Sequence, residues 1–147
     1  MRAEKLIEYL YTVIDEIKND NNYQIKADFL DDNINSYSID KLPTASTEEK
    51  FITGERIKRD VFALRSRFKY TSNQAEELDN VGFFEKFESK IERNNKDKIL
   101  PDIEGIESIE CLSSGSVVFA NNNNSCEMRI QIKVTYLDEG KQYPVSL

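Results

Sequence analysis

The sequence predicts an α+β fold in which an antiparallel sheet of about four to five strands is packed on one face by two helices. Apolar residues recur at helical spacing over 2–19 and 74–94, whereas they alternate with polar residues before the second helix and after residue 107. Side chains alternate across a strand but return to one face of a helix every three to four residues, so the two periods are distinguishable. We expect a single domain, 1–147.

An apolar stripe predicts the first helix. Leucine, valine and isoleucine recur at helical spacing, and charged residues fill most of the other positions, as in a helix with one buried side. The polar run Asn19–Asn22 ends the pattern. The stripe consists of Leu6, Leu10, Val13, Ile14 and Ile17.

Short strand-like segments follow this helix. Tyr23–Leu30 is weakly patterned and fits either a short strand or an irregular edge. Asn35–Leu42 alternates polar and apolar residues and is expected to be a strand that Pro43 stops, because proline cannot donate to a sheet ladder. Thr44–Gly54 is expected to be a loop, with one helical turn around Glu48–Phe51 as an option.

A basic segment then interrupts an otherwise acidic chain. Residues 55–70 contain six Lys/Arg and two Asp/Glu, a net charge of +4, whereas the whole chain carries −7, which leaves −11 for the remainder. From Phe62 onward apolar and basic residues alternate, which predicts a strand with one apolar and one cationic side. The apolar positions are Phe62, Leu64, Phe68 and Tyr70, and the alternate positions are Ala63, Arg65, Arg67 and Lys69.

The second helix is expected to run from Gln74 to about Asn94. Asn73 and Glu76 form a capping-box-like signal at its start, because asparagine is a preferred N-cap and a carboxylate three residues later can bind back to its amide. Gly82 is expected to kink or break the helix. The buried stripe consists of Leu78, Val81, Phe83 or Phe84, Phe87 and Ile91.

The C-terminal third is expected to be sheet. Glu107–Leu112 and Ser116–Ala120 fit a hairpin around Ser113–Gly115. Every second residue of Cys126–Tyr136 is apolar, which predicts the most regular strand of the chain. Lys141–Leu147 follows as a short tail that is expected either to be mobile or to reach a neighbouring molecule.

The composition argues against an enzyme. The chain contains no histidine, which removes Ser-His-Asp and Cys-His triads, histidine general bases and almost every catalytic zinc site. A P-loop and a glycine-rich dinucleotide fingerprint are also absent from the sequence. Cys111 and Cys126 fall on inward positions of predicted strands and are expected to be buried free thiols rather than a bridge. We therefore predict no catalytic residue, no cofactor and no metal.

Acidic residues give no recognisable site either. Asp102, Glu104 and Glu107 could gather a hard cation, but their spacing matches no calcium loop, so an ordinary surface loop is the favoured interpretation.

No apolar run is long enough to cross a bilayer, and the N-terminus lacks the apolar core of a secretory signal. We therefore expect no membrane segment, and synthesis inside the cell. The net charge of −7 argues against a general nucleic-acid-binding protein, which is usually basic.

The cationic side of the basic segment is the candidate interaction surface. Three interpretations fit it: a solvated sheet surface balanced by Glu127 or Glu110 on a neighbouring strand, an interface with acidic helices of another subunit, or a nucleic-acid track. The aromatic residues fall on the opposite side of the strand and cannot stack bases beside the arginines, which counts against nucleic acid. The candidate interface residues are Lys58, Arg59, Arg65, Arg67 and Lys69.

Six segments, taken in order, carry a family resemblance: YSIDKLPT, FITG, KRDVFALRSRFKY, LDNVGFFEKFESKIERNN, LPDIEGIESIECLSSGSV and CEMRIQIKVTYLDE. Together they resemble the small minor-capsid or tail-terminator proteins of phages and prophages from low-GC Gram-positive bacteria, which also occur in phage-tail-like bacteriocin clusters. The resemblance covers nearly the whole chain and rests on the order and character of these segments, without a catalytic signature.

The resemblance implies helices packed on a sheet and assembly into a six-subunit ring that caps the head-proximal end of a tail tube. Such a ring would stop tube polymerisation, dock neck or head proteins and, in a contractile tail, contact the last sheath ring. The implied partners are copies of the chain, the tail tube protein, and sheath or neck proteins, with nucleic acid met only as DNA passing through the ring. The implied location is a virion or phage-tail-like particle, after synthesis in the bacterial cytoplasm.

Two other classes of function stay open. A small enzyme would be identified by an activity screen of the purified protein. A free-standing adaptor or nucleic-acid-binding module would be favoured by DNA binding that weakens with salt.

Overall fold

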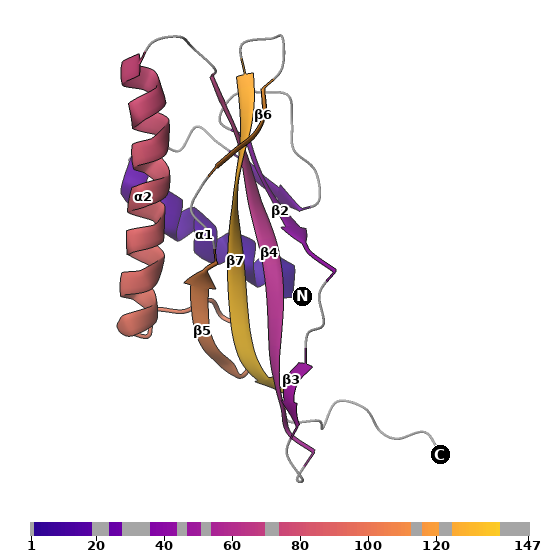
Figure 1. Ribbon diagram of the computed structural model, residues 1–147. Helices are drawn as coiled ribbons and strands as arrows, with labels where there is room; N and C mark the ends of the chain where they lie inside the picture. The colour runs from indigo at the N-terminus through magenta and orange to yellow at the C-terminus, as the bar shows by residue number, and fades with distance from the viewer. Residues whose placement is uncertain are drawn as a thin grey trace.

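The computed structural model describes two helices and seven strands (Figure 1). The residues described are 2–18, 24–27, 36–43, 47–50, 54–69, 74–112, 116–120 and 125–138.

Two long strands form the spine of the sheet. β4 (Arg56–Lys69) and β7 (Ser125–Asp138), each of 14 residues, pair antiparallel along their whole lengths, from Arg56↔Asp138 to Lys69↔Ser125. The alternation predicted for both segments explains this pairing, because two strands with matched periods bury their apolar residues on the same side. Figure 1 shows the two strands running side by side through most of the molecule.

Shorter strands line the two free edges of this spine. β2 (Ser36–Lys41) and β3 (Thr47–Lys50) pair with successive parts of β4, and β5 (Ile106–Cys111) and β6 (Ser116–Ala120) pair with successive parts of β7, all of them antiparallel. β1 (Gln24–Ala27) adds to β2 in the parallel direction. The main path across the sheet is β1-β2-β4-β7-β5. The predicted α+β class is confirmed, with a mixed but mostly antiparallel sheet.

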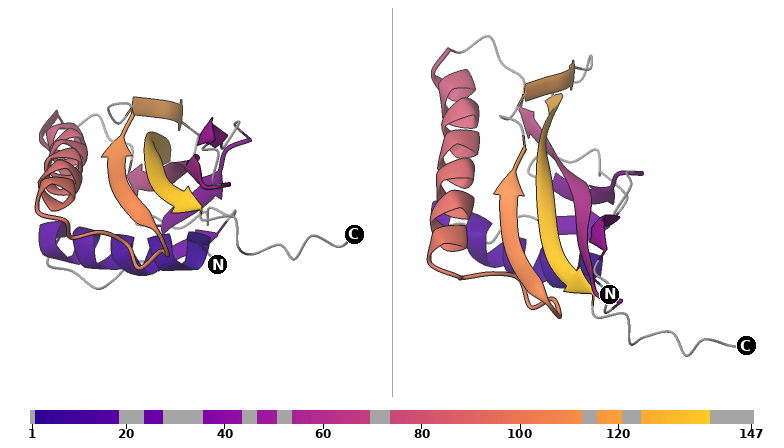
Figure 2. Two further views of the ribbon diagram at one scale, coloured as in Figure 1. Left: turned by 90° about the horizontal axis from the view of Figure 1, so that it is seen from below. Right: turned by 60° about the horizontal axis from the view of Figure 1, so that its bottom comes forward.

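Both helices pack against the sheet. α1 (Arg2–Lys18) crosses behind the strands, whereas α2 (Gln74–Lys96) runs lengthwise beside β5 (Figures 1 and 2). A chain of hydrogen bonds ties them together: the Tyr9 hydroxyl donates to the Ile99 carbonyl at 2.9 Å and accepts from Asn94 Nδ2 at 3.1 Å. The middle of α1 is thereby fixed to the C-terminal end of α2 and the residues just after it.

The core lies between the helices and the apolar side of the sheet, which we call the helix-side face. On β4 and β7, the apolar-parity residues Phe62, Leu64, Ile130, Ile132 and Val134 are buried. The described residues of the two predicted helix stripes are buried as well, except Ile17, which is half-buried. The largest fully buried side chains are Tyr37, Phe62, Phe87, Leu6, Leu10, Ile14, Ile39, Leu64, Ile91, Ile109, Ile130 and Ile132. The side chains of Phe68, Leu78 and Val81, also predicted to be in the core, lie outside the described residues.

Three local predictions are wrong. The segment Thr44–Gly54, expected to be a loop with an optional helical turn around Glu48–Phe51, contains the strand β3, because pairing with β4 outweighs a weak local preference. The break considered at Gly82 does not occur: α2 continues through this residue, since glycine costs a helix only about 1 kcal/mol and the aromatic residues after it are well packed. Glu107–Leu112 and Ser116–Ala120 do not form a hairpin with each other; each pairs with β7, which is long enough for both.

Two weaker predictions are confirmed. The segment Tyr23–Leu30 contains the short strand β1, and Asn35–Leu42 contains β2. The tail Lys141–Leu147 and the side chain of Cys126 lie outside the residues that the structure describes.

Candidate functional site

The predicted cationic strip lies partly on the side of the sheet opposite the helices. β2, β4 and β7 contribute neighbouring positions there, and their register places Arg65 between Ser38 on β2 and Arg129 on β7. We call this side the polar face. Its described residues on these strands include Ser36, Ser38, Asp40, Ala63, Arg65, Arg67, Glu127, Arg129, Gln131 and Lys133.

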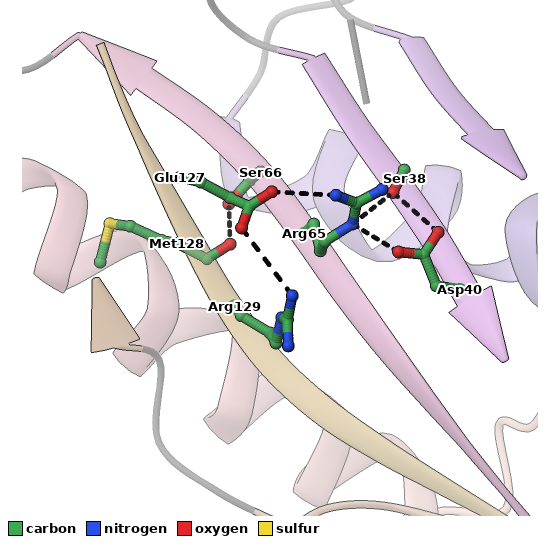
Figure 3. Close-up of polar contacts among 7 residues, drawn as sticks. All are labelled: Ser38, Asp40, Arg65, Ser66, Glu127, Met128 and Arg129. Atoms are coloured by element: carbon green, nitrogen blue, oxygen red, sulfur yellow. Dashed lines mark hydrogen bonds and ion pairs between the residues drawn. The ribbon is translucent and has the colours of Figure 1, made fainter. Parts of the chain in front are cut away.

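Arg65 is the centre of this face, with partners on both neighbouring strands (Figure 3). On β2 its guanidinium forms an ion pair with Asp40, and its Nε donates to Ser38 Oγ at 3.2 Å. Ser38 Oγ in turn donates to Asp40 Oδ1 at 3.1 Å. On β7, Arg65 Nη1 donates to Glu127 Oε1 at 3.0 Å. The guanidinium therefore links three strands.

Glu127 offsets the repulsion between two arginines that the strand register places opposite each other. Arg65 and Arg129 are directly opposed across β4 and β7, and like charges at such positions destabilise a sheet. Glu127 lies diagonal to Arg65 and contacts both cations, since its Oε2 is 3.9 Å from Arg129 Nη2. The contact with Arg129 is long, so Arg129 is the less firmly held of the two arginines.

Much of the polar face is buried. Ser38 and Ala63 are almost completely inaccessible, and Arg67 and Glu127 are each only 9% exposed. The side chain of Arg65 is 21% exposed, whereas that of Arg129 is 38% exposed. Ion pairs with so little access to water are screened less by salt than pairs on an open surface. The polar face is thus a largely enclosed surface on which the described residues of β2, β4 and β7 include four cations, Arg65, Arg67, Arg129 and Lys133, and two carboxylates, Asp40 and Glu127.

The five predicted interface residues do not form one patch. Arg65 and Arg67 lie on the polar face, and Arg59 has the same parity. Lys58 has the opposite parity and lies on the helix-side face, where its Nζ is 3.1 Å from Asp138 Oδ2. The side chain of Lys69 is outside the described part of the chain. Of the interpretations left open by the sequence, the balanced sheet surface is the one whose proposed partner, Glu127, contacts Arg65.

An ion pair between a buried carboxylate and a half-exposed lysine on the helix-side face was not predicted from the sequence. Asp60 is 1% exposed, and its Oδ1 lies 3.7 Å from the Nζ of Lys41, whose side chain is half exposed. Both residues occupy apolar-parity positions on β4 and β2. A charged residue on the apolar parity of each of two adjoining strands is the signal that could have indicated this pair.

A groove between α2 and β5 contains the described cysteine. It has a volume of about 370 Å³ and is lined by Glu88, Glu92, Asn95, Ile109, Glu110 and Cys111. Burial, followed by the nearby carboxylates of Glu88 and Glu92, raises the pKa of the Cys111 thiol to about 12. A thiol this weakly acidic is a poor nucleophile at neutral pH, because the thiolate is the reactive form.

The acidic residues considered as a possible cation site do not form one. Asp102, Glu104 and Glu107 are all exposed, and Asp102 is 3.7 Å from Lys5 Nζ. Among the residues described, no group of three or more acidic or cysteine side chains is arranged to hold a metal ion. Within the same stretches, neither helix has the length and apolar character needed to cross a bilayer.

No protein-family model matches the chain, and no curated protein sequence matches it.

Proposed function

We propose that this chain is a structural protein that closes into a ring, of six copies, at the head-proximal end of a phage or phage-like tail tube. There it ends tube polymerisation and offers a surface to neck components or, in a contractile tail, to the sheath. A ring that caps a tube must match the rotational symmetry of the tube, and this fixes the number of copies. The role requires no chemistry from the protein.

The main support is the agreement between the architecture that the family resemblance implies and the one described above. The resemblance implies helices packed on a sheet, and the chain has two helices packed on a mostly antiparallel sheet. The segment KRDVFALRSRFKY forms most of β4, and CEMRIQIKVTYLDE forms nearly all of β7. The resembling segments therefore supply the spine of the sheet, which lends weight to a likeness of fold.

The charges of the spine indicate where ring contacts belong. Ring closure needs two different surfaces that complement each other on every copy. Arg65 and Lys58 already have carboxylate partners within the chain, so we assign the cationic contact to Arg129, the more exposed and less firmly paired arginine of the polar face. The exposed carboxylates of Asp102, Glu104 and Glu107 are the candidate for the opposing surface.

Locating the protein in intact particles tests the proposal directly. We expect cryo-electron microscopy, or gold labelling of a tagged copy, to find one ring at the head-proximal end of each tail. Deleting the gene should give tubes of uncontrolled length, and supplying the protein in trans should restore the normal length. Density at the distal end, along the tube or in the capsid wall would overturn the proposal.

A reconstituted assay separates the two arginines. Purified tube protein is polymerised with and without the chain, and tube lengths are measured by electron microscopy. The wild-type chain should shorten the length distribution, and Arg129→Gln should lose much of this effect while remaining as stable as the wild type. Arg65→Gln is the matched comparison on the opposed β4 position. It should lose stability first, since it removes the ion-pair partner of Asp40 and leaves Glu127 with only its long contact to Arg129. If the wild type and Arg129→Gln shorten the tubes equally, Arg129 does not contribute to the contact between subunits.

A further inference from the structure

Four short strands form the outer boundary of the sheet. β1, β3, β5 and β6 each pair with only one other strand among the described residues. An outer strand presents backbone N–H and C=O groups to its surroundings, and another chain can pair with them and continue the sheet. Whether the outward backbone groups of each outer strand are free or already bonded therefore determines how copies of the chain can associate.

β5 is capped by a side chain from α2. The backbone N–H of Ile109 donates to Asn95 Oδ1 at 3.0 Å, whereas the N–H of Leu112 donates inward to the Gln131 carbonyl of β7 at 2.8 Å. The outward amide of Ile109 is thus already bonded. The groove along this edge is lined by Glu88, Glu92 and Glu110, so an approaching β5 strand of a second copy, which carries Glu107 and Glu110, would meet like charges.

β1 is capped in the same way from the other helix. The backbone N–H of Ile25 donates to the hydroxyl of Tyr11 in α1 at 2.9 Å. β1 has only four residues, so one capped amide is a large part of what the strand can offer. The two ends of the main sheet path are therefore each capped by a helix.

The other outer strands are short and irregular. β3 has four residues and β6 has five. The register of β3 against β4 shifts between Thr47 and Glu49, and that of β6 against β7 shifts between Val117 and Phe119. β5 also shifts, between Ile106 and Ser108. A register shift twists an edge strand and spoils the regular array of groups that a new strand needs.

We infer that Asn95 and Tyr11 are edge caps, and that they and the irregular outer strands prevent a second copy of this chain from extending the sheet. Contacts between copies are then made by side chains on the faces of the molecule and not by strand addition. This inference concerns how copies meet. It uses the proposed ring only as the setting, and it holds for any self-association of the chain.

Amide exchange and sedimentation of the full chain test the inference together. Replacing Asn95 by alanine keeps a good helix former in α2 but removes the acceptor for the Ile109 amide. The exchange of that amide, followed by NMR, should become about fivefold faster in the monomer, as expected for the loss of one ordinary hydrogen bond. At high concentration, sedimentation should show self-association beyond that of the wild type, and in these larger species the amides of Ile109 and Cys111 should again be protected from exchange.

The controls keep the test decisive. Lys96→Ala removes an exposed side chain one residue later on α2 and should behave as the wild type. Tyr11→Phe tests the second cap independently, with faster exchange expected at Ile25. The inference fails if both cap variants exchange and sediment as the wild type does, or if self-association of the wild type newly protects the edge amides. If copies of the chain at the tube end form one continuous sheet, the edge-cap inference is wrong and the proposed function stands. If the protein is found elsewhere in the particle, the proposed function is wrong and the edge-cap inference stands.

Discussion

The two faces of the β4–β7 ladder are both largely buried, but they are held by different forces. On the helix-side face, Phe62, Leu64, Ile130 and Ile132 are at most 1% exposed and pack against apolar side chains of the helices. On the polar face, Arg65 is held by directional contacts with charged and hydroxyl groups. Apolar packing depends mainly on area and shape, whereas a buried ion pair depends on having both partners in place.

This difference predicts how each face responds to change. The helix-side face should tolerate substitutions that conserve volume and should suffer from cavities. The polar face should tolerate loss of volume better than loss of one charge, because the remaining charge would be left without a partner at low exposure.

The largest expected effect is a cavity on the helix-side face. Ile132→Ala should lower the free energy of unfolding by about 2–5 kcal/mol, because it removes buried methylene groups from a fully enclosed position. Chemical denaturation followed by circular dichroism measures this. Ile132→Val, which keeps most of the volume, is the control and should cost about 0.5–1.5 kcal/mol. An unchanged unfolding midpoint for the alanine variant would show that the side assignment is wrong.

The next effect is on the polar face. Arg65→Ala should cost about 1.5–3 kcal/mol, the usual contribution of hydrogen bonds to charged groups, since Asp40 and Glu127 lose their shared cation. A double-mutant cycle with Glu127→Ala should give a coupling energy of about 0.5–3 kcal/mol. Additive effects of the two substitutions would mean that the pair seen in Figure 3 contributes nothing in solution.

A smaller loss of stability is expected when the Tyr9 hydroxyl, a polar group within the apolar core, is removed. Tyr9→Phe removes the hydroxyl that joins the Ile99 carbonyl to Asn94, and should cost about 0.5–1.5 kcal/mol. Tyr11→Phe is a comparison at a less buried tyrosine on the same helix, whose hydroxyl accepts a bond from the Ile25 amide, and it should cost less. Burial also raises the pKa of Tyr9 above its ordinary value of 10.0. The stability lost above pH 10 should therefore be smaller in Tyr9→Phe than in the wild type.

Ionisation of Cys111, at the rim of the helix-side face, should have the smallest effect on stability at neutral pH. Its pKa of about 12, against an ordinary 9.0, means that the thiol is protonated below pH 9 in both the folded and the unfolded protein. Its contribution to stability is complete below pH 9 and is lost as the pH rises toward 12. In a Cys126→Ala background, labelling by a thiol reagent at pH 8 should be much slower than for a free thiol, because far less of the Cys111 side chain is thiolate. Rapid labelling would show that the groove is wetter than its residues indicate.

Parity was predictable from the sequence, and register was not. The alternation around Phe62 and Ile130 placed both residues on the apolar side, and the structure confirms it. No local pattern aligns Arg65 with Arg129 or brings Asp40 beside Arg65, because register depends on where two distant segments happen to match. From the sequence, Glu127 was therefore predictable only as one of two partners for the basic segment. Asp40 was missed because it belongs to a strand whose position in the sheet was unknown.

The same limit explains the errors at the sheet edges. β5 and β6 follow one another in sequence and have strand-like composition, which favours a hairpin. β7 is long enough for β5 and β6 to pair with different parts of it. These pairings become available only after β7 has formed as a long strand in the spine of the sheet. The contacts of Asn95 and Tyr11 with edge amides likewise depend on where the helices pack, which composition does not encode.

The separation of β4 and β7 in sequence has a consequence for biosynthesis. Partners in this ladder are 56 to 82 residues apart, so the central pairing of the sheet is entirely non-local. At about 5–20 residues per second, Arg56 is synthesised roughly 4–16 s before its partner Asp138. A nascent β4 spends this interval without the strand that pairs along its whole length, and non-local sheets also close slowly once complete. Basic residues spaced along a hydrophobic strand discourage aggregation during such exposure, and residues 55–70 carry a net charge of +4. We therefore expect fewer basic residues in this segment to increase aggregation during synthesis before they change the folded protein.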